Sequence, residues 1–443
     1  MVKVILKHGR DESLRRFHPW VFSGAVAQVQ GSPAEGDIVG VYSAEGQFLA
    51  SGHWQVGSIA VRILSFDADP TAPEFWIDSI ARAYAARQAV CLSGLGTVPE
   101  NVPLRVTPPT DCVSGPLPLT EPRVATVFQD STQTLQGQRI TNCFRLVHGE
   151  GDGLPGLIID WYDGVCVMQA HSVGMFRAKM QICEALKAVF GERLKAVYDK
   201  SSGTAPFKAG LELIDGYLYK APGFAASETV VLENGRKFLV NWEEGQKTGF
   251  FLDQRDNRAL VGKYAAGRRV LNLFCYTGGF SIYALTAGAV QVDSVDSSAK
   301  AMSLVERNIA LNRDAASPEL SVTNYCEDAI EFLRKTPEGK YDLMIVDPPA
   351  FAKHRGALKN ALRAYQRLNA AAIAKVAPGG LVFTFSCSQV VDKITFANTV
   401  FSAAAQTGRS VRILDRLCQG ADHPVSIYHP EGEYLKGLLL YVE

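Results

Sequence analysis

The sequence lacks a C-x-x-C pair, a long apolar run and a charge excess of either sign. Its nine cysteines are odd in number and none stands three positions from another, which argues against a disulfide framework and against a cysteine zinc site. No apolar run approaches the ~20 residues that span a bilayer, and the N-terminus has no secretion signal. We therefore expect a cytoplasmic protein with no membrane partner and no bound metal.

The charge balance counts mildly against a nucleic-acid binder. Lys and Arg number 45, and Asp and Glu also number 45, whereas proteins that bind nucleic acids often carry a basic excess. A local cluster near the start of the chain includes Lys7, Arg15 and Arg16. It predicts either an RNA-binding face or an ordinary solvated surface over a β core.

The length of 443 residues and the hydrophobic content of 47% predict a globular chain of two to four domains. Residues 1–72 alternate short β-rich runs with glycine turns, which favours a small β-barrel. Residues 73–240 contain a linker helix at about 74–90 and, from 143, a central α+β domain. Between these, the Pro-rich stretch at about 92–139 is typical of an irregular surface insertion.

Residues 241–443 alternate apolar strands with helices, so we expect an α/β fold with a doubly wound parallel sheet. The last two strands have no helix between them and predict an antiparallel hairpin. The strands are expected at 269–274, 290–296, 320–325, 341–347, 380–386, 410–417 and 435–442.

Ligands of such sheets bind at the carboxyl ends of the strands. In "LNLFCYTGGFSIYA" the glycines at 278 and 279 allow close approach of a ligand, but the string is not G-x-G-x-x-G, which disfavours an NAD-dependent dehydrogenase. Asp296 ends the next strand and could accept hydrogen bonds from a ribose, or it could cap a helix. Asp328 ends the third strand and could bind an adenine amine or serve as a plain helix cap.

Two further strand ends carry reactive or rigid groups. In "DLMIVDPPAF" the prolines stiffen the chain and would hold Asp347 and Phe351 beside a planar substrate, although a plain proline turn is the alternative. In "FTFSCS", Cys387 stands between two serines just after a strand. A thiolate is a strong nucleophile only when it is accessible and its pKa is lowered; otherwise such a cysteine is a small hydrophobe.

Together these strings resemble the class I S-adenosylmethionine-dependent methyltransferases, and more narrowly the bacterial 23S rRNA cytosine-5 methyltransferases with an N-terminal PUA domain. "FRLVHGEGDGLPGLIID" at 144–160, "KTGFFLDQRDNR" at 247–258 and "ADHPVSIYHPEGEYLKG" at 421–437 extend the resemblance over nearly the whole chain. The stretch at 92–139 is longer than the usual connection in the family.

The resemblance implies S-adenosylmethionine as cofactor and 23S rRNA as partner and substrate. It implies that Pro348 and Phe351 contact the target base, and that Lys7, Arg15 and Arg16 grip the RNA. The residues that it assigns to the cofactor are Phe251, Gln254, Arg258, Asn272, Phe274, Thr277, Gly278, Asp296, Asp328 and Asp347.

The resemblance also assigns catalysis to Cys387 and Asp347. C5 of cytosine is a poor nucleophile, and attack of the thiolate at C6 turns the ring into an enamine. Asp347 would hydrogen-bond the base edge near N3 and N4. Pro349 stands where many RNA cytosine-5 enzymes have a second cysteine that helps to release the product, so release here needs another group.

Two other functions stay open at this point. The D-P-P-x-F motif also suits an rRNA purine N-methyltransferase, which needs no cysteine, and a non-catalytic RNA-binding ribosome assembly factor could keep the fold. The sequence does not give the target nucleotide, the base that removes the C5 proton or the oligomeric state, for which a homodimer is one option.

Overall fold

The computed structural model describes residues 1–90, 141–206, 210–352 and 354–443, so the Pro-rich stretch at 92–139 lies outside the described residues. The described residues form two compact units. The first comprises those within Met1–Asn142, Leu146–Ile159 and Gly164–Phe224, and the second those within Cys143–Arg145, Asp160–Asp163 and Ala225–Glu443. Within the described ranges, no helix is both long enough and apolar enough to cross a bilayer.

The first unit begins with a six-stranded sheet in the order β2-β6-β5-β4-β1-β3. The edge strands β2 and β3 are separated in sequence only by the three-residue 3₁₀ turn Ser23–Ala25, so the sheet must curl until its edges approach each other, as in a barrel. Val4, Val39 and Val61 are fully buried inside it. The elements are β1 (Val2–Leu6), α1 (Glu12–Arg15), β2 (Trp20–Phe22), β3 (Val26–Gln30), β4 (Ile38–Tyr42), β5 (Phe48–Trp54) and β6 (Ile59–Ser65).

A second sheet, in the order β11-β10-β9-β8-β7, follows in the chain. β10 pairs parallel with β9 and antiparallel with β11, and all six residues of β9 are buried. The α2 helix begins with Pro73, whose fixed φ suits the first helical turn. The elements are α2 (Pro73–Ala89), β7 (Cys143–His148), β8 (Leu157–Tyr162), β9 (Val165–Ala170), α3 (Val173–Arg177), α4 (Lys179–Phe190), β10 (Ala196–Asp199) and β11 (Gly216–Lys220).

The second unit is built on a seven-stranded sheet in the order β16-β15-β14-β17-β18-β20-β19. The strands from β16 to β18 are parallel, and β20 is antiparallel to both of its neighbours. The strand order reverses between β14 and β17, which confirms the predicted doubly wound sheet and its closing hairpin. The strands are β14 (Arg269–Leu273), β15 (Gln291–Asp296), β16 (Ser321–Cys326), β17 (Tyr341–Val346), β18 (Val376–Ser386), β19 (Val411–Cys418) and β20 (Lys436–Val442).

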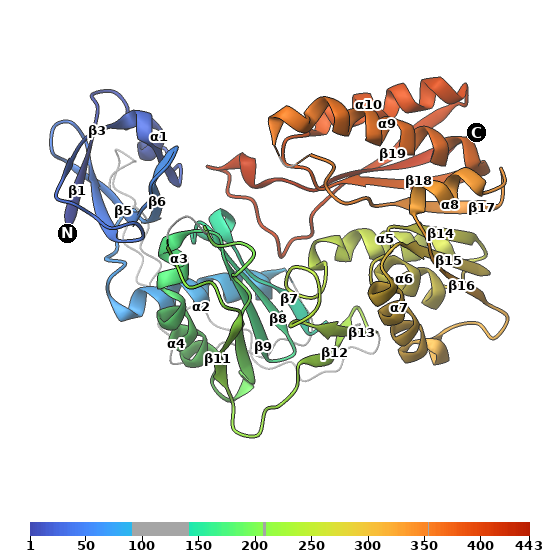
Figure 1. The fold of residues 1–443 in the computed structure, drawn as a ribbon, viewed down its shortest axis with the longest axis horizontal. Coiled ribbons are helices and arrows are strands. Elements are labelled where there is room, and N and C mark those ends of the chain that lie inside the picture. Colours follow the sequence, from blue (N-terminus) through green and yellow to red (C-terminus); the bar gives the residue numbers. More distant parts are fainter. Residues whose placement is uncertain (91–140, 207–209, 353) are drawn as a thin grey trace, which may run out of the picture. The chain divides into compact units, whose positions relative to one another are not determined.

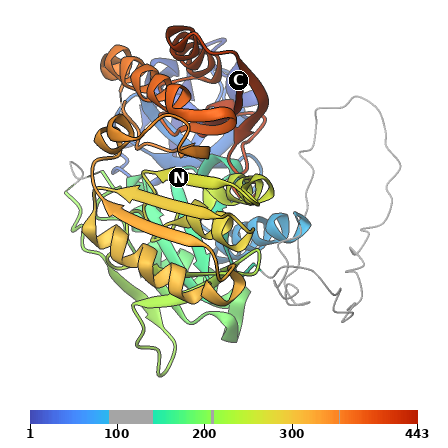
Figure 2. The same cartoon turned by 90° about the vertical axis from the view of Figure 1, so that its right-hand side faces the viewer.

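Helices cover both faces of this sheet (Figure 1 and Figure 2). Successive side chains of a strand point to opposite faces, so Leu271 and Leu273 pack into one core while Val270 packs into the other. The first core is covered by α8 (Ala329–Lys335), α9 (Leu358–Lys375) and α10 (Lys393–Thr407), and the second face by α5 (Arg255–Ala265), α6 (Gly279–Thr286) and α7 (Ala299–Leu311).

A hairpin of β12 (Glu228–Glu233) and β13 (Arg236–Asn241) precedes the sheet. Its two-residue turn is Asn234-Gly235, and both residues have positive φ, at 49° and 76°. Asn-Gly is the sequence that favours a turn of this kind. Asn308 on α7 accepts a hydrogen bond from the Leu239 amide at 2.8 Å, so the hairpin is fixed against the helix.

Candidate active site

A pocket of about 290 Å³ lies in the second unit, at the carboxyl ends of β14, β15, β17 and β18. Parallel strands present their carboxyl ends at one edge of a sheet, so residues far apart in sequence meet there. The pocket is lined by residues that include Lys247, Phe250, Phe251, Asp253, Gln254, Arg258, Phe274, Tyr276, Thr277, Gly279, Asp296, Ser298, Asp347, Pro348, Pro349, Cys387 and Leu435.

The chain turns tightly after β14. Phe274 has φ 58° and Tyr276 has φ 48°, and Gly278, with φ 80°, precedes the first residue of α6. Left-handed conformations are costly for residues with a side chain and persist where the surrounding structure enforces them. Lys247, with φ 50°, also lines the pocket, so strained backbone borders it on two sides. A Cβ on Gly279 would stand 3.0 Å from Arg258 Cδ, so only glycine fits this position without displacing the arginine.

Asp296 ends β15 at the pocket wall. Its Oδ2 accepts a hydrogen bond from the Tyr276 amide and its Oδ1 accepts one from the Ser298 amide, both at 2.9 Å. Each carboxylate oxygen can accept more than one hydrogen bond. The side chain is thus held rigidly while it keeps capacity to accept hydrogen bonds from a ligand.

Asp347 follows β17 and is partly exposed at the pocket wall. Its Oδ2 accepts a hydrogen bond from Gln254 Nε2 at 2.9 Å. Burial, with a further contribution from the negative charge of Asp253, raises the pKa of Asp347 to about 7. This carboxyl group can therefore carry a proton near neutral pH and act as a hydrogen-bond donor.

Cys387 follows β18 and is also partly exposed in the pocket. Burial raises the pKa of its thiol to about 11; the charge of Asp347 adds to the increase, and that of Lys247 opposes it. A nucleophilic thiol requires a lowered pKa, but in the protein without a ligand the pKa of Cys387 is raised. A further positive charge that enters the pocket, beside that of Lys247, would favour the thiolate.

Not every residue singled out in the sequence lines the pocket. Asn272 is buried in β14 and donates to Ser281 Oγ at 2.9 Å. Asp328 caps α8, accepting from the Ile330 and Glu331 amides at 2.9 Å, which is the alternative role considered for it. Phe351 packs on Tyr365 with ring centroids 4.7 Å apart. Gly278 shapes the turn without lining the pocket itself.

The basic residues proposed to grip RNA belong to the first unit and are all exposed. Lys7 donates to the Gly24 carbonyl at 2.9 Å. Arg15 and Arg16 pair with carboxylates one helical turn before them, at 2.7 Å and 2.5 Å. The exposed Arg16 pair is weak and screened by salt, so its guanidinium stays available to a phosphate, whereas Arg15 also donates to Gln47 Oε1 at 2.9 Å.

Sequence reasoning missed several residues of the pocket. Asp253 lies within the recognised string "KTGFFLDQRDNR", but nothing in its spacing distinguished it from the neighbouring polar residues. Other missed residues that line the pocket are Gln246, Lys247, Phe250, Cys275, Tyr276, Phe280, Ser297, Ser298 and Leu435.

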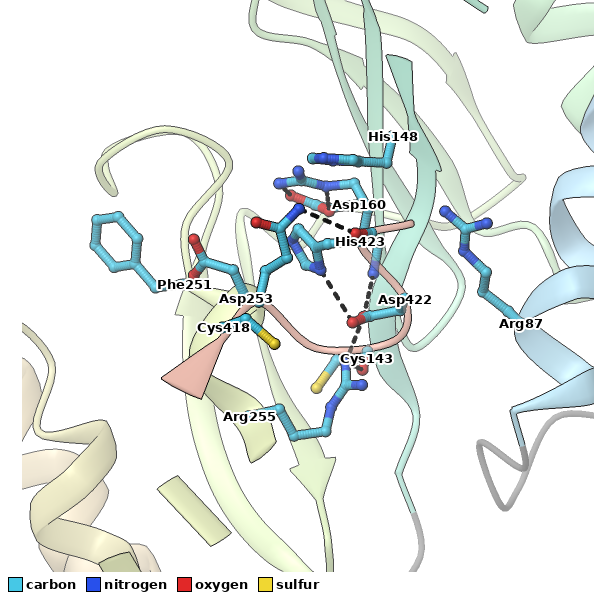
Figure 3. A network of polar contacts seen from close by, with 12 residues as sticks. Arg87, Cys143, His148, Asp160, Phe251, Asp253, Arg255, Cys418, Asp422 and His423 are labelled. Carbon is cyan, nitrogen blue, oxygen red and sulfur yellow. Dashed lines mark hydrogen bonds and ion pairs between the residues drawn. The ribbon is translucent and has the colours of Figure 1, made fainter. Parts of the chain in front are cut away.

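Buried charges tie the loop after β19 to the start of α5 (Figure 3). Asp422 is fully buried and accepts from Arg255 Nη2 at 2.6 Å and from the Arg145 amide at 2.9 Å. Burial opposes ionisation of Asp422, but the charges of Arg255 and His423 outweigh it and hold its pKa well below the usual range. The loop is thus anchored by a permanent charge pair.

Replacing Asp422 with Ala is expected to destabilise the second unit by about 3–5 kcal/mol, because Arg255 would be left buried without this partner. Urea unfolding, followed by the transition of this unit, measures the effect. Asp415→Ala removes an exposed carboxylate from β19 and should change stability by less than about 0.5 kcal/mol. Equal effects of the two substitutions would show that the buried pair does not anchor the loop.

Comparison with known families identifies both parts of the chain. A family profile described as S-adenosylmethionine-dependent methyltransferase matches residues 212–439. A profile described as PUA-like domain matches residues 4–66. Together with the observed sheets, these matches confirm the fold class predicted from the sequence.

Curated relatives match over nearly their whole length. Ribosomal RNA large subunit methyltransferase I from Aeromonas hydrophila is 36% identical, with 99% of this chain and 98% of the relative covered. The protein of the same name from Pseudoalteromonas atlantica is 37% identical, with 99% of each covered.

Solved structures share the fold. One, described as a candidate S-adenosylmethionine-dependent methyltransferase from Streptococcus mutans, aligns with a TM-score of 0.74 at 19% identity, covering 100% of both chains. A second, described as a candidate methyltransferase complexed with SAH, aligns with a TM-score of 0.75 at 20% identity, again covering 100% of both chains.

Proposed function

This chain belongs to the S-adenosylmethionine-dependent methyltransferases that carry a PUA-like N-terminal domain, and on that premise we propose that it methylates C5 of a cytosine in 23S rRNA. The observation that carries the proposal is that Cys387 lines one pocket together with Asp347 and Asp296. A thiol beside a carboxyl group that holds a proton near pH 7 suits the activation of a pyrimidine ring. The names of the curated relatives support the choice of large-subunit rRNA as substrate.

The residues of the pocket fit the cofactor. Asp296 is held by two backbone amides with acceptor capacity to spare, which suits ribose hydroxyls. The strained turn at Phe274 and Tyr276, followed by Gly279, brings backbone close to whatever occupies the pocket. When bound, S-adenosylmethionine supplies a methyl group attached to a positively charged sulfur. We propose that Asp296 and this turn hold it, with Gln254 and Phe251 covering it.

Asp296→Ala is expected to weaken S-adenosylmethionine binding about 10–100-fold, since hydrogen bonds to a charged group contribute about 1.5–3 kcal/mol. Isothermal titration calorimetry on the folded variant measures this change. Asp392→Ala is the control, because Asp392 caps α10 through the Thr395 amide and does not line the pocket. Asp328→Ala in the same series tests whether Asp328 binds the adenine amine of the cofactor. If it does, this variant must lose more affinity than the control Asp392→Ala. An unchanged affinity of Asp296→Ala would remove Asp296 from the cofactor site.

The reaction that we propose assigns the chemistry of the base to two side chains. Cys387 loses its proton to solvent, which the positive charge of the bound sulfonium would favour, and its sulfur forms a bond to C6 of cytosine. The electron pair of the C5–C6 double bond shifts toward C4 and N3, and N3 takes the proton of Asp347. C5 accepts the methyl group and loses its proton to solvent or to a nearby base. The C6–sulfur bond then breaks, returning its electrons to Cys387, and N3 returns its proton to Asp347.

The product decides between this reaction and methylation of a purine nitrogen. 23S rRNA from a strain lacking the gene, incubated with the protein and isotope-labelled S-adenosylmethionine, should yield labelled 5-methylcytidine after digestion to nucleosides. Mass spectrometry identifies the nucleoside. A labelled N-methylpurine would overturn the proposal in favour of the reaction that needs no cysteine, and the absence of label with demonstrated cofactor binding would favour an assembly factor.

A further inference from the structure

Asp253 is a buried carboxylate that shares the pocket with Asp347 and Cys387. It is 7% exposed and lies in the 3₁₀ turn Leu252–Gln254. Its Oδ2 accepts a hydrogen bond from the Tyr434 hydroxyl at 2.6 Å, whereas its Oδ1 is buried and has no hydrogen-bond partner among the described residues. The next residue, Gln254, holds Asp347, so one short turn brings a second carboxylate to the edge of the site.

The two carboxyl groups have opposite electrostatic environments. Burial opposes ionisation of Asp253, but His423, Lys247 and the hydrogen bond from Tyr434 outweigh it and lower its pKa. Burial and the charge of Asp253 together raise the pKa of Asp347 to about 7. Figure 3 shows Asp253 beside the loop that carries His423. Environments that separate two carboxyl groups in this way assign one as the anion and the other as the acid.

The charged and titratable groups around the pair come from several elements. They are Lys247 before the turn, Arg258 on α5, Arg145 on β7, His423 and Tyr434 between β19 and β20, and Cys387 after β18, with Lys436 on β20 and Tyr365 on α9 beside Cys387. Arg258 is engaged by Glu233 through two hydrogen bonds of 2.7 and 2.8 Å, so its charge is largely neutralised. Asp253 is therefore the negative charge that acts on Asp347.

We propose that Asp253 is a positioning residue that keeps the proton on Asp347 and thereby selects cytosine over uracil as the target base. N3 of cytosine accepts a hydrogen bond, whereas N3 of uracil carries a hydrogen and donates one. A protonated Asp347 matches the first base, and an ionised Asp347 matches the second. A site built to donate to N3 rejects the base that lacks the acceptor, because two donors would face each other. This inference rests on the proposed function.

The test compares Asp253→Asn, which removes the charge but keeps the shape, with the unaltered protein over pH 5.5–9.5. In the reactive form Asp347 is protonated and Cys387 is ionised, so the two groups together have lost one proton. The population of this form, and with it kcat/KM, should therefore rise with pH through the lower pKa of the coupled pair. In Asp253→Asn this acid limb should move to lower pH by about one unit, because a nearby like charge has been removed. Discrimination between 23S rRNA with cytosine and with uracil at the mapped target should fall about tenfold.

A second readout needs neither RNA nor cofactor. The charge of Asp253 also raises the pKa of Cys387, so Asp253→Asn should increase alkylation of Cys387 by iodoacetamide about tenfold at pH 8. Peptide mass spectrometry separates Cys387 from the other cysteines. Asp256→Asn removes an exposed carboxylate from the start of α5 and should change neither readout. Tyr434→Phe removes the hydrogen bond but keeps the charge and should preserve the acid limb.

The outcomes distinguish a failure of this inference from a failure of the proposed function. An unmoved acid limb and unmoved alkylation in folded Asp253→Asn would overturn the role of Asp253 even if the product is 5-methylcytidine. A moved alkylation profile with a purine product would support the charge coupling but overturn the proposed function, and with it the selection of cytosine. If Asp253→Asn does not fold, Lys247→Met must move both profiles to higher pH, because Lys247 lowers the pKa of both groups. Profiles that stay in place would contradict the inference.

Discussion

Cys387→Ala should lower kcat for methyl transfer by at least about 10³-fold, because alanine leaves no group that can attack C6. Without that bond, C5 of cytosine has too little electron density to take up a methyl group. The side chain is partly exposed at the edge of a core and alanine removes only its sulfur, so the variant should still fold. Transfer of labelled methyl groups to 23S rRNA measures the rate, and calorimetry should give an unchanged affinity for S-adenosylmethionine.

The matched control for Cys387→Ala is Cys418→Ala, which removes an exposed cysteine at the end of β19. This control should keep activity within about twofold of the unaltered protein. If Cys387→Ala instead keeps more than about a tenth of the activity, the thiol does not form a bond that the reaction requires. The D-P-P-x-F motif would then be working on a base nitrogen.

Asp347→Asn is expected to lower kcat about 10²–10⁴-fold, which is the range that proton transfer contributes to catalysis. The amide can still donate a hydrogen bond to N3 but has no acidic proton to transfer to it. The acid limb of the pH–rate profile should also move to higher pH, since the group with the pKa of about 7 has been removed and only the ionisation of Cys387 then controls the limb. Single-turnover kinetics between pH 5.5 and 9 measure both effects.

Asp342→Asn serves as the control on the same strand. Asp342 lies near the start of β17, pairs with Arg269 at 2.7 Å and does not line the pocket, so its loss should affect stability more than rate. Activity of Asp347→Asn within threefold of the unaltered protein would exclude proton donation by this residue.

The sheet of the second unit could be predicted because its strands are apolar runs separated by helices. The expected strand at 341–347 is β17, Tyr341–Val346, and the expected strand at 269–274 is β14, Arg269–Leu273. The start of β18 was missed because Pro378, Gly379 and Gly380 do not match the composition of a strand. The insertion of β20 between β18 and β19 was not predictable, because a hairpin pattern does not say which of its strands joins the sheet.

Strand ends predicted the edge of the sheet at which the pocket lies, but not the direction of each side chain. Asp296, Asp347 and Cys387 come from three strands and line one pocket. Asn272 lies on a strand of the same edge, yet its side chain points to Ser281 inside the protein. A one-residue difference along a strand reverses the side to which a side chain points, and motif spacing does not resolve it.

The place of Asp253 in the pocket could not be predicted from the sequence for a different reason. The residue that binds its carboxylate, Tyr434, is 181 positions further along the chain, and His423 comes from the same distant loop. Charge coupling of this kind depends on distances that only the folded chain establishes.

The most direct measurement is a covalent trap of the enzyme on RNA that carries 5-fluorocytosine at the target position. Fluorine at C5 cannot leave as the proton does, so the bond between sulfur and C6 should persist after methyl transfer. We predict a denaturation-resistant complex that requires S-adenosylmethionine and whose crosslinked peptide contains Cys387. Failure to form this complex on RNA whose unsubstituted form is methylated, or a crosslink at another residue, would contradict the account.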